Sequence, residues 1–301
     1  MECFGKRVMQ NSKIEDLLSN VDSLVKNLYL FSVDVKFPAN TKAGVSIAHS
    51  DLKERRSDFL RELKNTICSW VYGKSKYKNL FEDELAKRNS DYQNVASHIE
   101  FLARKKFRKG HPQGQFGELL LFNFIQFFFE APAILRKMPL TTNSSVERFG
   151  ADAIHYKEKQ SNNILYLGEA KTYESKYQFN AAMEASVKSI LKTYEEIEDE
   201  MLLYTYDDFI EPELQEIAKS IQDNDLPNVK YELVSVVSYN ETKNKDEDCE
   251  EKINQKVKEI VASRLASCDK ADDVDKNILK RMHFIVFPIW ELDKLLKDFE
   301  G

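Results

Sequence analysis

The stretch ILYLGEAKTY, residues 164–173, decides the fold prediction. It begins with apolar residues typical of a buried β-strand, and alternate side chains of a strand point to the same face of a sheet. One face therefore carries, in order, Leu165, Leu167, Glu169 and Lys171. A carboxylate and an ammonium group thus follow two apolar side chains at the end of the strand. Charges in such a place must be paired with one another or bind an ion.

The flanking sequence alternates between helical and extended patterns. Residues 116–129, FGELLLFNFIQFFF, form the longest apolar stretch, interrupted by Glu118, Asn123 and Gln126. This stretch is shorter than the ~20 residues that span a bilayer, so it predicts a helix buried on nearly all sides. The other expected elements are strands at 133–140, 151–156, 231–239 and 282–287, and helices at 179–201 and at the C-terminus. This order predicts a mixed α/β fold.

The remaining regions give weaker patterns. Before residue 110 we expect a mostly helical N-terminal region, 1–109, with a strand at 28–37 and helices at 51–72 and 79–107. The α/β core is expected to occupy residues 110–301. Within it, residues 241–280 are highly charged and read as a solvated insertion with a helix at 251–267.

The composition limits the class of protein. Of the 301 residues, 42% are hydrophobic, enough for a sizeable core, while 31% are charged and the mean hydropathy is -0.51. These values predict a soluble globular protein and exclude fibrous, disordered and membrane classes. The four cysteines lie far apart without a C-x-x-C motif, and the start, MECFGKRVMQ, lacks an apolar signal core. We therefore expect a reducing, cytoplasmic location and no disulfide framework.

The net charge of -6 argues against a protein that coats nucleic acid electrostatically. Much of the acidic excess lies in 241–280 and in 195–213, however, and residues 101–110 are basic. The candidate DNA-contacting side chains are Lys105, Lys106, Arg108, Lys109 and Lys176. The alternative for the basic segment is a solvated helix end, where cations suit the helix dipole and Gly110 ends the helix. Lys176 is alternatively ordinary loop surface.

Three carboxylates from three different elements are candidates for a metal site. Glu118 lies in the apolar helix, Asp152 belongs to the strand before the central one, and Glu169 ends the central strand. Mg²⁺ prefers such oxygen ligands and keeps several waters. Lys171 then positions or deprotonates a water, or stabilises charge on a phosphate. The alternative is a salt-bridged strand edge, with Asp152 in a turn and Glu118 near a helix N-terminus.

The E-x-K tripeptide alone is not specific. It occurs five times, at Glu62/Lys64, Glu169/Lys171, Glu174/Lys176, Glu241/Lys243 and Glu250/Lys252. Only Glu169/Lys171 ends a clear strand that is preceded by an acidic strand and by an acidic residue in a buried helix. The conjunction, rather than the tripeptide, makes this pair the candidate.

Three stretches carry a resemblance to known proteins: GQFGELLLF (114–122), RFGADAIHY (148–156) and LYLGEAKTY (165–173). Their order of helix-Glu, strand-Asp, strand-E-x-K and helix resembles the PD-(D/E)XK nuclease superfamily. The stretches look more closely like the HamA family, the nuclease subunit of Hachiman anti-phage systems. The resemblance covers about residues 110–240. One departure is Ala151, which stands where the superfamily pattern has proline and removes no ligand.

The resemblance implies a restriction-endonuclease-like core and a Mg²⁺-dependent DNA nuclease of bacterial defence, with Mn²⁺ as a substitute metal. It implies that a helicase subunit of the same system, HamB-like, controls the nuclease. Asp152, Glu169 and the Ala170 carbonyl are implied as metal ligands, Lys171 as the catalytic lysine and Glu118 as the helical carboxylate. Two alternatives remain open: a catalytically silent adaptor that docks a helicase, and a sequence-specific restriction-type endonuclease.

Overall fold

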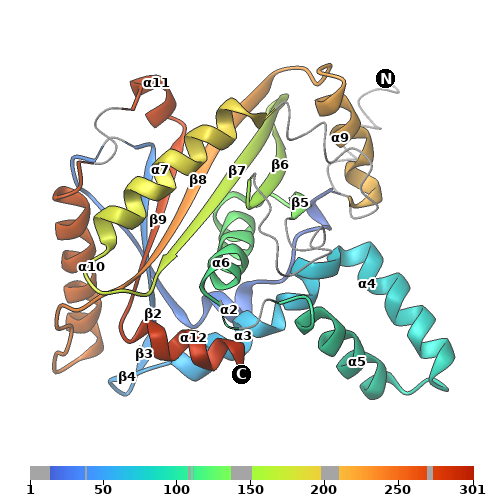
Figure 1. The fold of residues 1–301 in the computed structure, drawn as a ribbon, viewed down its shortest axis with the longest axis horizontal. Helices are drawn as coiled ribbons and strands as arrows, with labels where there is room; N and C mark the ends of the chain where they lie inside the picture. Colours follow the sequence, from blue (N-terminus) through green and yellow to red (C-terminus); the bar gives the residue numbers. More distant parts are fainter. Residues whose placement is uncertain are drawn as a thin grey trace.

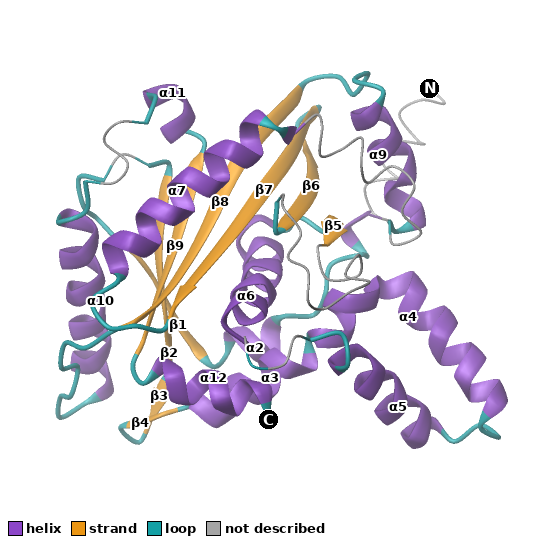
Figure 2. Cartoon of the chain, in the orientation of Figure 1, coloured by secondary structure: helices purple, strands orange, loops and turns teal. Residues whose placement is uncertain are grey.

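The computed structural model describes residues 14–37, 39–107, 110, 112–136, 151–197, 210–269 and 274–301. A seven-stranded mixed sheet lies between two layers of helices (Figures 1 and 2). This architecture confirms the predicted α/β class and is consistent with a restriction-endonuclease-like core. None of the helices in the described parts of the chain is long and apolar enough to cross a lipid bilayer.

The sheet has a parallel centre and antiparallel edges. In spatial order its strands are β1 (Leu28–Ser32), β2 (Thr41–Ile47), β9 (Met282–Ile289), β8 (Val229–Asn240), β7 (Asn162–Tyr173), β6 (Ala153–Lys159) and β5 (Ala133–Arg136). The strands β2, β9, β8 and β7 run parallel, while β1, β6 and β5 pair antiparallel with their neighbours. The carboxyl ends of the four parallel strands therefore meet at one edge. A separate two-stranded hairpin joins β3 (His49–Ser50) and β4 (Lys53–Glu54).

Each face of the sheet has its own helical layer. The first layer contains α2 (Asp22–Val25), α3 (Arg56–Asn65), α4 (Ile67–Lys87), α5 (Tyr92–Arg104), α6 (Pro112–Phe129) and α12 (Leu292–Glu300). The second contains α7 (Phe179–Glu195), η2 (Pro212–Leu214), α9 (Gln215–Gln222), α10 (Glu250–Ala266) and α11 (Lys276–Leu279). The far part of α4 and α5 form a helical hairpin that projects from the body (Figure 1).

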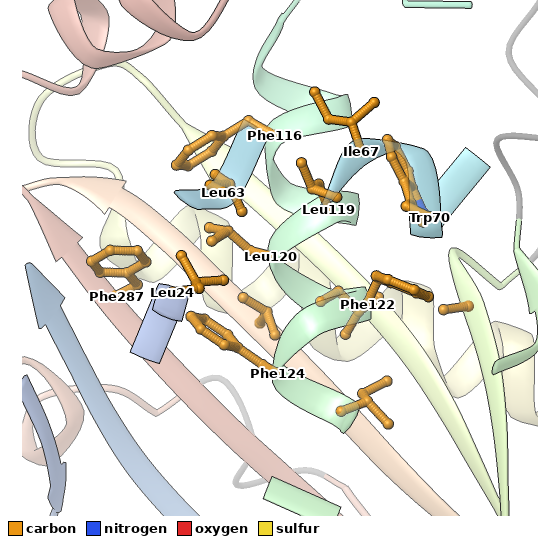
Figure 3. Close-up of a cluster of buried hydrophobic side chains, with 14 of the residues drawn as sticks. Leu24, Leu63, Ile67, Trp70, Phe116, Leu119, Leu120, Phe122, Phe124 and Phe287 are labelled. Atoms are coloured by element: carbon orange, nitrogen blue, oxygen red, sulfur yellow. The ribbon is translucent and has the colours of Figure 1, made fainter. Parts of the chain in front are cut away.

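The apolar helix α6 is the centre of the first layer (Figure 3). Leu119 and Leu120 are fully buried. Phe116 meets Phe299 of α12 with ring centroids 5.4 Å apart, and Phe124 meets Phe287 of β9 at 6.3 Å. Because neighbours surround α6, its sequence is apolar on all sides, as predicted. Each such side chain stabilises the fold by roughly 1.5–3 kcal/mol relative to an exposed one.

The N-terminal third differs from the prediction in two ways. The predicted helix at 79–107 is wrong, because α4 ends at Lys87 and α5 begins at Tyr92. Asn89 and Ser90 adopt positive φ in this turn, and the Asp91 carboxylate then accepts the Asn94 N–H at 3.0 Å and caps α5. The 51–72 helix is likewise divided, between α3 and α4. The second difference is β2, which was not predicted, and which joins β1 to the central sheet beside β9.

The charged segment after β8 is packed more closely than its composition predicts. In α10, Val257, Val261 and Leu265 are buried. The Glu241 carboxylate at the end of β8 is also buried, and it accepts the Arg264 guanidinium of α10 at 2.6 and 3.0 Å. The helix predicted at 251–267 is confirmed as α10, but the prediction of a solvated insertion is wrong for this part of the segment.

Helix α4 is kinked at Gly73, which has φ 72° and ψ -178°. Glycine alone adopts this backbone region readily, and a Cβ there would lie 2.2 Å from Oε1 of Glu211. Gly73→Ala is expected to lower the free energy of unfolding by about 1–3 kcal/mol, measured by urea denaturation. Gly114→Ala in α6 is the control, because a Cβ at Gly114 meets nothing within 4 Å. Equal losses in both variants would contradict this interpretation.

Candidate active site

Two buried acids meet where β6 and β7 come together. Asp152 directly precedes β6, and its backbone N–H donates to the Gly168 carbonyl at 3.1 Å. Its side-chain Oδ2 accepts the Ala170 N–H at 2.9 Å. The Asp152 carboxylate is thus fixed against β7 beside Glu169. Both residues are almost completely buried, Asp152 at 5% and Glu169 at 3% exposed.

The Glu169 carboxylate uses its two oxygens differently. Oε1 accepts the Lys171 ammonium at 2.6 Å and the Ser189 hydroxyl of α7 at 2.8 Å. Oε2 is buried and has no hydrogen-bond partner among the described residues. Leu165 and Leu167, which precede Glu169 on the same face, are buried in the core under α7, as the alternation of the strand predicts. One carboxylate oxygen is therefore held by donors and the other is left without one.

The electrostatics of the pair favour a bound cation. Burial and, after it, the negative charge of Asp152 raise the pKa of Glu169 to about 7, although Lys171 and Ser189 act in the opposite direction. The two carboxylates therefore repel one another when both are charged. A divalent cation held by these carboxylates would relieve that repulsion and would give Glu169 Oε2 a partner.

The donor set fits a hard cation such as Mg²⁺. This ion is commonly held by one or two carboxylates, and waters and substrate phosphates complete its octahedral shell. Asp152 and Glu169 supply two carboxylates, and the unpartnered Oε2 is a ligand atom of the required chemistry. Within the described residues, no three acidic, histidine or cysteine side chains form a metal-binding group by themselves.

Glu118 belongs to α6, in the helical layer on the other face of the sheet from α7. It follows Gly117 in α6, and a Cβ at Gly117 would lie 2.6 Å from Thr172 Oγ1 and 3.3 Å from the Ala170 Cβ. This close contact places the start of α6 against Ala170 and Thr172 of β7, on the face opposite to Glu169. The Glu118 side chain is partly exposed. Its role as a third ligand, and that of the Ala170 carbonyl, stay predictions.

A cavity of about 1140 Å³ opens at the carboxyl ends of the parallel strands. Its walls include Thr172 and Tyr173, which directly follow Lys171, together with Asn240 of β8 and Trp290 after β9. Gln113 in the first turn of α6 also lines it. The cavity lies at the end of β7, and its lining residues do not include Asp152, Glu169 or Lys171.

Three of the predicted basic residues lie in the described part of the chain, and the structure places each of them separately. Lys176 lines the large cavity. Lys105 shares a smaller cavity of about 200 Å³ with the first turn of α6, and its ammonium lies 4.5 Å from the centre of the Phe101 ring. The ammonium of Lys106 lies 5.7 Å from the Tyr72 ring centre. Arg108 and Lys109 lie outside the described residues.

Ser189 is a residue of the site that the sequence analysis missed. Its hydroxyl donates to Glu169 from α7, 20 positions further along the chain. The available signal was a row of small side chains in the expected helix, Ala182, Ser186, Ser189 and Thr193, at spacings of three and four residues. Such spacing places side chains on one helix face.

The comparisons with known proteins give one family. A model of the HamA family matches residues 18–300, nearly the whole chain. No curated protein matches the sequence. The family match includes the N-terminal third and the segment after β8, neither of which contributed to the resemblance seen in the sequence motifs.

Proposed function

Because the chain belongs to the HamA family of Hachiman anti-phage defence proteins, we propose that it is the metal-dependent DNA nuclease of its defence system. The observation that carries the proposal is the buried Glu169 carboxylate. It lies beside Asp152, is paired with Lys171 through one oxygen, and has no partner for the other among the described residues. This arrangement suits a site that hydrolyses phosphodiesters with Mg²⁺.

Each residue has a defined task in the proposed reaction. Asp152 and Glu169 would hold the ion, with Glu118 as the candidate for a further carboxylate. When bound, Mg²⁺ supplies positive charge that polarises the phosphodiester and lowers the pKa of water. The Lys171 side chain is 29% exposed, and its ammonium pairs with the Glu169 carboxylate at 2.6 Å. There it would position a water or stabilise charge on the phosphate.

The proposed substrate is DNA, delivered and controlled by a helicase subunit. The chain has a net charge of -6, which predicts weak binding to free DNA at physiological salt. Lys105, Lys106 and Lys176 would contribute local phosphate contacts. A partner that brings DNA to the cavity compensates for the unfavourable overall charge, and the same partner can restrain a nuclease that would otherwise damage host DNA.

The test is DNA degradation by the purified chain, alone and with its helicase partner. We expect fragments with Mg²⁺ or Mn²⁺ and none when EDTA removes the metal. Single-stranded and duplex substrates should be tried in parallel, since both fit the proposed reaction. A well-folded protein that never cleaves DNA, even with its partner present, would contradict the proposal.

A catalytically silent adaptor is the second candidate function. It is favoured by the lack of a group of three metal-ligating side chains within the described residues. An adaptor should show no thermal shift with Mn²⁺, whereas the proposed nuclease should be stabilised by Mn²⁺ and lose that shift in Asp152→Asn. This measurement separates the two functions without a cleavage assay.

A further inference from the structure

We propose that Ser189 is a positioning residue that orients the Glu169 carboxylate toward the metal ion. The inference rests on the proposed function, because it assigns Glu169 as a ligand. It adds a residue from a different element, α7, and states what its hydroxyl does. Ser189 touches neither metal nor substrate in this assignment, and acts through Glu169.

The packing of α7 brings Ser189 to this place. Helix α7 lies across β7 and β8, with Met183, Val187 and Ile190 buried against them. One turn before Ser189, the Ser186 hydroxyl meets the Ser235 hydroxyl at 2.5 Å, and Ser235 is the neighbour of Glu169 in the β7–β8 ladder. The helix is therefore fixed in register with the sheet at the level of the Glu169 side chain.

The hydroxyl of Ser189 helps to fix the direction in which the second carboxylate oxygen of Glu169 points. Ser189 and Lys171 both donate to Oε1, at 2.8 and 2.6 Å, from the helix and from the strand. Two donors on the same oxygen fix the plane of the carboxylate, because turning the carboxylate out of that plane would break both hydrogen bonds. Oε2, which has no donor among the described residues, is then the oxygen presented to a cation.

Lys171 alone gives a weaker constraint on the carboxylate. It is the proposed catalytic group, and its side chain is long, with 29% of it exposed. When Lys171 turns toward a phosphate, the hydrogen bond from Ser189 would continue to hold Oε1. Removing a residue that holds a metal ligand in this way typically lowers the metal affinity by roughly 10- to 100-fold. Because Ser189 is partly exposed, we expect the lower end of that range.

The experiment measures Mn²⁺ affinity of the full chain by isothermal titration calorimetry at pH 8.5, where Glu169 is charged. Ser189→Ala is expected to raise the Kd for Mn²⁺ about tenfold, and Ser189→Thr, which keeps the hydroxyl, to restore it. The matched control is Ser186→Ala, which removes a buried hydroxyl one turn away that contacts Ser235 instead of Glu169.

The thermal unfolding temperature of each metal-free variant measures its stability independently of its Mn²⁺ affinity. A role in positioning predicts that Ser189→Ala weakens Mn²⁺ binding more than Ser186→Ala does, whatever the two variants do to stability. Unchanged Mn²⁺ affinity in Ser189→Ala, or equal weakening in Ser186→Ala, overturns the assignment of Ser189 while the proposed function stands. If the wild-type chain itself binds no Mn²⁺, the proposed function fails, and the assignment fails with it.

Discussion

Replacing Lys171 with methionine is expected to slow DNA cleavage roughly 10²- to 10⁴-fold, a far larger effect than its effect on Mn²⁺ affinity. Methionine keeps much of the aliphatic length of lysine but removes the ammonium group that donates to Glu169 Oε1 at 2.6 Å. The proposed role of that ammonium is to act on water or phosphate during the reaction. Its loss should therefore appear in the rate of the cleavage step, measured by single-turnover kinetics with saturating metal.

The carboxylate variants should behave differently from Lys171→Met. Asp152→Asn and Glu169→Gln remove charge from the proposed ligands, so both are expected to lose Mn²⁺ binding and cleavage together. The control is Lys252→Met, since Lys252 belongs to another E-x-K tripeptide, on α10, and pairs with Asp248 at 2.7 Å. Cleavage that survives in Lys171→Met, or that is lost equally in Lys252→Met, would falsify the assignment of the strand lysine.

The local geometry of the acidic pair was predictable because it depends on short-range rules. Alternation along β7 places Glu169 and Lys171 on one face. β6 and β7 are joined by the tight turn at Gln160 and Ser161, so their antiparallel register brings Asp152 beside the end of β7. The burial of α6 followed from its continuous apolar composition. Each of these features is determined by residues close together in the sequence.

The features that escaped prediction depend on contacts between distant segments. Strand β2 pairs with β9. Ala43 therefore lies beside Ile285, although most of the chain separates these two residues in the sequence. The short sequence TKAGVSI, with Gly44 and a lysine, gives no strong strand pattern by itself. Ser189 reaches Glu169 only because α7 packs across β7 and β8 with a particular rotation. Helical periodicity identifies the inner face of α7 but does not show which strand residue each side chain meets.

Glu169→Gln is expected to stabilise the metal-free protein by about 3 kcal/mol at pH 8 while it abolishes cleavage. Burial and the Asp152 charge raise the pKa of Glu169 from its ordinary value of 4.5 to about 7. Between those two values the folded chain holds a proton that the unfolded chain has released. Stability therefore falls as the pH rises from about 4.5 to 7, by ~1.4 kcal/mol per unit, and stays low above pH 7.

Glutamine removes this cost because it carries no charge and can still accept hydrogen bonds from Lys171 and Ser189. The difference in unfolding free energy between wild type and Glu169→Gln should be near zero at pH 4, grow through pH 7 and then level off, as measured by urea denaturation in EDTA. Glu247→Gln, at an exposed position, is the control and should show no such dependence on pH.

Adding Mn²⁺ at pH 8 should stabilise the wild type and remove much of its lower stability relative to Glu169→Gln, because the ion compensates the same repulsion that destabilises the metal-free site. A pH-independent difference between the two proteins would mean that Glu169 carries no buried charge, and the argument for a cation at Oε2 would then fail.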